Sequence, residues 1–234
     1  MAIAYWRRVS NGFGIAGFVL CAWGFFYPWP YVLVVSLMAI TPVVGLVVAR
    51  ASRGVIDPLN EEKAGANLAT FVVLPPLLLA LRVMFDFPLV DGLRLMGIGA
   101  AFGVAFGLLF WWIKPPYVAA KPRRWWDMAA GAFAALWYGC TVAALLNGIL
   151  PQGVAQRFEE PVLAKHISSG KHTSYYVDLP PLGPDREADE WDVGRRTYQQ
   201  MAVGDHVCIY IYPGGLGEPW WDSEKCRPSK AATS

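Results

Sequence analysis

The feature that most constrains this chain is an uncharged stretch, residues 9–49, which lies between Arg8 and Arg50. A helix that crosses a bilayer needs about 20 mostly apolar residues, so this stretch is too long for one span. A Pro-Trp-Pro segment at 28–30 interrupts it. Proline lacks the backbone donor that a helix requires and disfavours helix in the residue before it. We therefore expect two spans joined by a tight turn.

The whole first part of the chain follows the same pattern. We expect five transmembrane helices, over residues 13–27, 31–49, 68–85, 95–113 and 128–150. The first span is expected to remain uncleaved, because no small-x-small cleavage site follows its apolar core. Hydrophobic residues make up 55% of the chain and charged residues only 16%, against roughly a quarter in soluble domains. This composition excludes a plain soluble globule, a disordered chain and a disulfide-dense mini-protein.

The distribution of Lys and Arg predicts the orientation of these spans. If the N-terminus is cytoplasmic, the cytoplasmic segments contain nine such residues: Arg7, Arg8, Arg50, Arg53, Lys63, Lys114, Lys121, Arg123 and Arg124. The opposite side contains two, Arg82 and Arg94. Short cytoplasmic loops carry the excess of positive charge. With five spans the C-terminal part then lies outside, so we expect a bacterial inner-membrane protein with a periplasmic domain.

Small residues recur on one face of each of the last two spans. Glycine occupies every fourth position at Gly99, Gly103 and Gly107, and a matching stripe contains Gly131, Ala135 and Gly139. Membrane helices associate through close backbone contact, which glycine permits. We expect these two helices to pack against each other. The alternative is that one stripe forms the seam of a homo-oligomer.

Charged residues at the ends of the spans are expected to form ion pairs at the membrane interface. Arg82 and Asp86 are four residues apart on one predicted helix, and Asp91 and Arg94 lie near the start of the next. The spans contain few other polar groups, whereas a transport path needs several. This shortage argues against transport, and a small-molecule or lipid transporter, or a channel component, is kept as an alternative interpretation.

The chain changes character after Leu150, where short alternating segments replace long apolar runs. Segments 161–168, 174–179 and 206–212 read as strands, and 193–201 reads as a strand or a short helix. In the last strand Val207, Ile209 and Ile211 share one face. We expect a transmembrane domain over 1–152, a small all-β domain (a sheet or an open barrel) over 153–222, and a disordered tail over 223–234.

Three elements of this tail carry a resemblance. They are a tyrosine-valine strand around Tyr176, a strand of alternating Val, Ile and Tyr introduced by Gly204-Asp205, and a closing Pro213-Gly214 element. Together they resemble a small barrel found at the C-terminus of uncharacterised multi-pass bacterial inner-membrane proteins, over roughly residues 162–221. The resemblance implies this architecture and carries no activity.

The two cysteines of the tail, Cys208 and Cys226, can form a disulfide or remain free thiols. An oxidising compartment favours pairing. Closing a loop of about 18 residues contributes about 3 kcal/mol. Cys21 and Cys140 lie within predicted spans, where a thiol is simply a small apolar group.

Catalytic and metal-binding signatures are absent from the sequence pattern. The three histidines are in the tail, at His166, His172 and His206, but none shows the spacing of a metal-ligand motif. There is no Gly-x-Ser-x-Gly, phosphate-binding loop or dinucleotide fingerprint. We expect no cofactor, and a membrane-bound enzyme or metal protein using these histidines is an alternative. From residue 151 onward there are 9 Lys and Arg against 12 Asp and Glu, a net charge of −3, which argues against nucleic-acid binding.

The leading hypothesis is a non-catalytic membrane protein whose β-domain binds a protein partner. Tyrosine and tryptophan supply large, rigid contact area at low entropic cost. The expected binding residues are Tyr176, Tyr210, Tyr212, Trp220 and Trp221. The partner would be another subunit of an envelope complex, a protein neutralised by an immunity-type protein, or a second copy of this chain, with membrane lipids around the spans.

Overall fold

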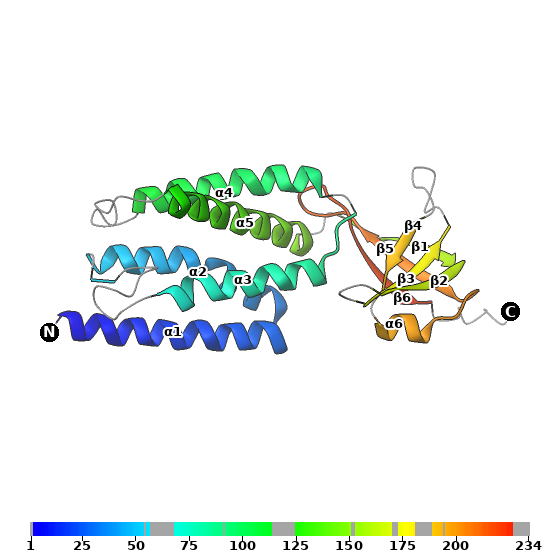
Figure 1. Ribbon diagram of the computed structural model, residues 1–234, viewed down its shortest axis with the longest axis horizontal. Coiled ribbons are helices and arrows are strands. Elements are labelled where there is room, and N and C mark those ends of the chain that lie inside the picture. Colours follow the sequence, from blue (N-terminus) through cyan, green and yellow to red (C-terminus); the bar gives the residue numbers. More distant parts are fainter. Residues whose placement is uncertain are drawn as a thin grey trace. The chain divides into compact units, whose positions relative to one another are not determined.

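The computed structural model describes residues 2–53, 55–56, 68–90, 92–113, 125–150, 153–169, 173–180, 189–193 and 195–226. The chain divides into two compact units. The helical unit is formed by Met1–Leu150 and Gly215–Glu218, and the β-unit is formed by Pro151–Gly214 and Pro219–Ser234. Five long apolar helices followed by a small all-β region confirm the predicted fold class (Figure 1).

The helical unit contains α1 (Ala2–Phe26), α2 (Tyr31–Ala51), α3 (Ala69–Asp86), α4 (Leu93–Ile113) and α5 (Trp125–Ile149). Each of these five is long and apolar enough to cross a membrane, so the chain is a membrane protein. The helix α1 begins well before residue 13, where the first span was predicted to start. The charges of Arg7 and Arg8 limit the apolar span, but they do not interrupt the backbone hydrogen bonds of the helix.

Side chains of α2, α3 and α5 form the main buried cluster of the helical unit. Its members are Val34, Val35, Met38, Leu79, Val83 and Leu145. Helix α3 packs against both α1 and α2, as the ribbons show (Figure 1). The two prolines predicted to lie within the third span, Pro75 and Pro76, are inside α3, which continues past them to Asp86.

Glycines bring α4 and α5 into backbone contact. A Cβ added to Gly139 would lie 2.2 Å from the backbone nitrogen of Gly103, and one added to Gly99 would lie 2.6 Å from the Cα of Cys140. A Cβ at Gly107 would be 3.9 Å from that of Ala135, an ordinary contact, and one at Gly131 would meet nothing within 4 Å. Close packing is therefore confined to the part of the two stripes around Gly99, Gly103 and Gly139.

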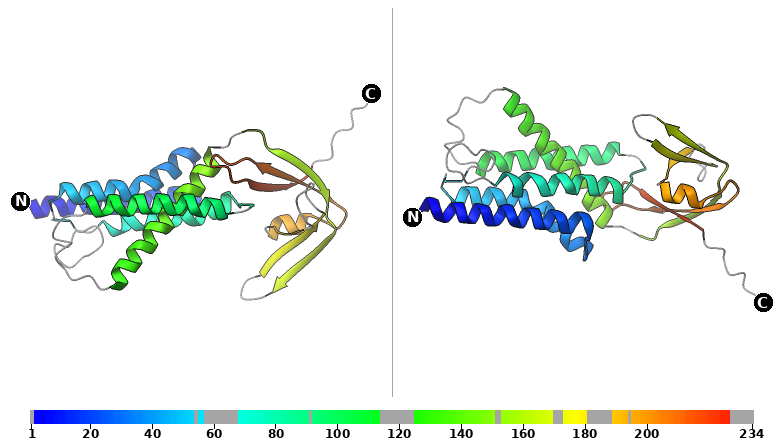
Figure 2. Two further views of the ribbon diagram at one scale, coloured as in Figure 1. Left: turned by 90° about the horizontal axis from the view of Figure 1, so that it is seen from above. Right: turned by 60° about the horizontal axis from the view of Figure 1, so that its bottom comes forward.

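The β-unit contains two three-stranded antiparallel sheets, with strand orders β1-β5-β6 and β2-β3-β4 (Figure 2). The strands are β1 (Gln156–Pro161), β2 (Ala164–Ser169), β3 (Thr173–Leu179), β4 (Asp189–Asp192), β5 (His206–Tyr212) and β6 (Trp220–Lys225), with a short helix α6 (Arg195–Gln200) before β5. Their common core contains Val162, Val177, Leu179, Trp191, Val193, Met201, Val207 and Ile209. Residues from both sheets face this one core.

Three of these strands differ from the sequence prediction. Strand β1 shares only Pro161 with the first predicted strand, and no strand was predicted over β4 or β6. The ordered chain also continues through β6 to Cys226, so residues 223–226 do not belong to a disordered tail. These segments lack apolar alternation, and their pairing with β3 and β5 makes them strands. Residues 227–234 lie outside the described residues.

Candidate functional site

The outward face of the β1-β5-β6 sheet brings together aromatic and charged side chains. Directly paired residues share a face of a sheet, and the register pairs Arg157 with Tyr210, Tyr210 with Asp222, and Tyr212 with Trp220. The alternating residues Val207 and Ile209 on β5 are buried in the core. We call the set Arg157, Tyr210, Tyr212, Trp220 and Asp222 the outward patch.

Aromatic rings at one end of the outward patch are stacked. The rings of Tyr212 and Trp220 lie parallel, with centroids 4.2 Å apart and planes 10° from each other. Stacking of this kind fixes both rings in place before any partner arrives. The side chains of Arg157 and Asp222 add one charge of each sign beside Tyr210. The outward patch therefore offers rigid aromatic area together with polar groups.

The structure does not bring all five predicted binding residues together. Trp221 points into the core, where it meets Trp191 edge-on with centroids 4.4 Å apart, so its prediction as part of an outward surface is wrong. The alternation along β6 places neighbouring Trp220 and Trp221 on opposite faces. Tyr176 belongs to the other sheet, on β3, where it stacks on His166 at 5.1 Å.

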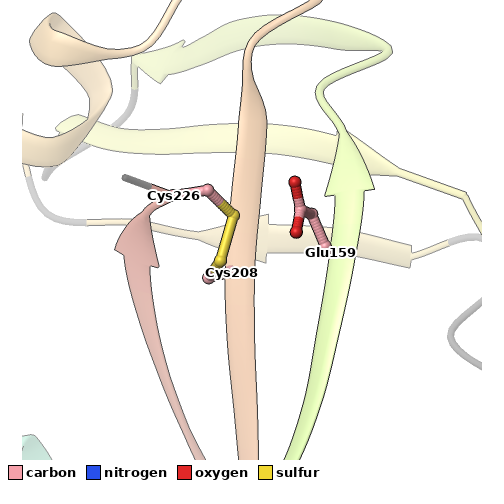
Figure 3. Close-up of side chains that lie close together, drawn as sticks. All are labelled: Glu159, Cys208 and Cys226. Carbon is pink, nitrogen blue, oxygen red and sulfur yellow. A yellow bond between two sulfur atoms is a disulfide. The ribbon is translucent and has the colours of Figure 1, made fainter. Parts of the chain in front are cut away.

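Cys208 and Cys226 form a disulfide between β5 and the end of β6. The close-up shows the carboxylate of Glu159, on β1, beside this bond (Figure 3). Among the described residues these three form a group whose ligand atoms lie within 4.8 Å of one another. While the sulfur atoms are bonded to each other they are not thiolates, and a thiolate is the form that binds a metal. The oxidised pair therefore does not fit a metal site.

The two described histidines lie in different sheets. Nδ1 of His166, on β2, is 3.4 Å from Oδ1 of Asp178. Nδ1 of His206, on β5, is 3.7 Å from Oε1 of Glu159. Each histidine has its own carboxylate partner, and His172 lies outside the described residues. The described part of the chain thus does not join the tail histidines into one site.

The predicted interface pair Arg82–Asp86 is part of a small network in the helical unit. Nε of Arg82 donates to Oδ2 of Asp86 at 2.7 Å, and the hydroxyl of Tyr31 donates to the same oxygen at 2.8 Å. The guanidinium of Arg82 also donates to the carbonyl of Phe25 at 3.0 Å. Each charge is thus satisfied by neighbouring helices, as an anchoring pair would be. Asp91, the predicted partner of Arg94, lies outside the described residues.

A fully buried asparagine holds the segment Gly215–Glu218 in the helical unit. Nδ2 of Asn147 donates to the carbonyl of Glu218 at 2.8 Å, and Oδ1 accepts from the backbone nitrogens of Leu216 at 3.1 Å and Glu218 at 3.4 Å. The carbonyl of Asn147 accepts from the nitrogen of Gly215 at 2.9 Å. One side chain near the end of α5 thereby replaces the backbone partners that this irregular segment lacks.

Sequence reasoning missed Arg157, Glu159 and the role of Asn147. The segment around Arg157 contains one large apolar side chain, Phe158, among polar and charged neighbours, so no apolar alternation marked it as a strand. An asparagine within an apolar span was a signal, because such a residue needs hydrogen-bond partners there. The sequence could not show that these partners come from residues 215–218. Comparisons of the chain with protein families, curated proteins and solved structures found no match.

Proposed function

We propose that this chain is a non-catalytic membrane-anchored binding protein whose β-unit binds another protein through the outward patch. The observation that carries the proposal is the in-register set of stacked Tyr212 and Trp220, with Tyr210 between Arg157 and Asp222. Aromatic side chains with a flanking arginine are typical of the residues that dominate protein interfaces. Because the rings of Tyr212 and Trp220 are already stacked, less side-chain entropy is lost when a partner binds.

The excess of Lys and Arg in the expected cytoplasmic segments supports an inner-membrane location with the β-unit in the periplasm. The disulfide supports the same side, because such bonds persist in oxidising compartments. This orientation is testable in a variant in which Cys21 and Cys140 are replaced by alanine. A membrane-impermeant maleimide should label neither remaining cysteine in intact cells until an impermeant reductant is added. Labelling that requires permeabilised membranes would place the β-unit in the cytoplasm.

The binding site is testable by photo-crosslinking in the native membrane. A benzoyl-phenylalanine in place of Tyr210 should give one discrete adduct, identified by mass spectrometry. The matched control is the same replacement at Tyr176, on the outward side of the other sheet, which should give none. Tyr212→Ala should reduce the adduct at position 210, because it removes the stacked pair.

Three outcomes would contradict the proposal. Equal adducts at positions 210 and 176 would mean random collisions, and an adduct at 176 alone would move the site to the β2-β3-β4 sheet. An adduct of twice the mass of the chain would show that the partner is a second copy of this protein and not a different protein.

A further inference from the structure

The positively charged side chain of Arg157 contacts one of the two sulfur atoms of the β-unit disulfide. Nη2 of Arg157 lies 3.0 Å from Sγ of Cys208, and Nε lies 3.3 Å from the same atom. A neutral sulfur is a weak hydrogen-bond acceptor. A thiolate beside an arginine is strongly favoured over the thiol. Two N–H groups directed at one sulfur thus match the charge that Cys208 would acquire if the disulfide opened.

The two cysteine residues differ in their exposure to solvent. Cys208 is only 1% exposed, whereas Cys226, which follows the last residue of β6, is part-exposed. Exchange is faster when the departing sulfur is the better-stabilised thiolate. Leaving-group stability thus selects attack on Cys226, with Cys208 as the departing thiolate.

Neighbouring charges orient the arginine. Oε2 of Glu159 accepts from Nη2 of Arg157 at 3.1 Å, and the other carboxylate oxygen lies 3.7 Å from Nδ1 of His206. The side chains of Arg157 and Glu159 are 51% and 50% exposed, so water screens part of their charge. Glu159 is accordingly a positioning residue, which holds the guanidinium against Cys208 without reacting.

We propose that Cys208–Cys226 is a thiol–disulfide exchange site for an external dithiol, in which Cys226 is attacked and Cys208 leaves as a thiolate stabilised by Arg157. In the first step a bond forms between the incoming sulfur and Cys226 while the Cys208–Cys226 bond breaks, and its electron pair departs with Cys208. In the second step the other thiolate of the dithiol attacks the incoming sulfur, and Cys226 leaves and takes a proton from water. The chain gains two electrons, and the dithiol becomes a disulfide.

The direction of attack is tested on the full-length protein in detergent, with Cys21 and Cys140 replaced by alanine. The protein is exposed briefly to glutathione as a monothiol probe, quenched with acid, alkylated and digested for mass spectrometry. The expected product carries glutathione on Cys226 and the alkyl group on Cys208. Glutathione on Cys208, or equally on both cysteines, would overturn the proposal.

The role of the arginine is tested by the rate at which dithiothreitol reduces the disulfide. Arg157→Gln should slow this step by about threefold or more, because the leaving thiolate loses its cation, and Arg157→Lys should restore part of the rate. Arg195→Gln, which removes an exposed arginine on α6, is the matched control and should leave the rate unchanged. An unchanged rate in Arg157→Gln would mean that the bond is only structural. The product analysis above needs no Arg157 variant, so it decides the proposal even if Arg157→Gln unfolds.

Discussion

Replacing Asn147 with leucine should release the segment Gly215–Glu218 from the helical unit. The side chain of Asn147 is fully buried and makes two short hydrogen bonds to this segment and a third at 3.4 Å. Leucine has the same number of side-chain heavy atoms and the same branch point but no polar atoms, so the variant removes the bonds without opening a cavity. The carbonyl of Glu218 and the nitrogen of Leu216 would then lack partners.

The expected magnitude follows from the number of groups that lose a partner. Each buried backbone group left unsatisfied costs about 1–3 kcal/mol, so two such groups should lower the local stability of this segment by about 2–6 kcal/mol. Local opening on this scale should accelerate amide hydrogen exchange at Leu216 and Glu218 by about 30-fold or more, at 1.36 kcal/mol per tenfold change.

The measurement is hydrogen exchange by mass spectrometry on a peptide that contains residues 214–218. The matched control is Thr141→Val on the same helix. The hydroxyl of Thr141 donates only to the carbonyl of Trp137, within α5, so its loss should leave exchange in the segment unchanged. Native exchange rates in Asn147→Leu would refute the conclusion that this asparagine holds the segment. Faster exchange in both variants would point to general loosening of α5.

Two further predictions concern packing. Gly139→Ala should lower the thermal stability of the protein in detergent, because the added Cβ would lie 2.2 Å from a backbone nitrogen of α4. The control Gly131→Ala should not, because a Cβ there meets nothing within 4 Å. Equal melting temperatures of the two variants would contradict the close α4–α5 contact. Trp221→Ala should destabilise the β-unit by about 2–4 kcal/mol, since it removes a large ring from the core, and should expose the unit to limited proteolysis. Tyr210→Ala should leave protease resistance unchanged, and the reverse order of sensitivity would mean that the two faces of the sheet are misassigned.

Much of the architecture follows from local patterns along the chain. The uncharged run between Arg8 and Arg50, broken by prolines, predicted the first two helices, and α2 begins at Tyr31 as expected. Alternation along 206–212 predicted β5, with Val207 and Ile209 inward. Such predictions succeed because the period of apolar residues reports directly which face of an element is buried.

Strand register decided which predicted site residues lie together. Trp220 and Trp221 are equivalent in composition, and only the pairing of β6 with β5 places one outward and the other in the core. Tyr176 is separate from the outward patch because its strand β3 pairs with β2 and β4 in the other sheet. Register depends on contacts between distant segments, so a prediction from aromatic content alone could not distinguish these positions.

The sequence by itself determined that this chain has five apolar spans and a small β-region, because the hydrophobic effect acts on each segment according to its own composition. Only the tertiary structure decided which polar groups meet. Arg157 reaches the sulfur of Cys208, and Asn147 binds a segment about 70 residues away in the chain, because folding brings distant backbone and side-chain groups within hydrogen-bond distance. Hydrogen bonds depend on the distance and direction between groups in space, and the order of residues along the chain specifies neither directly.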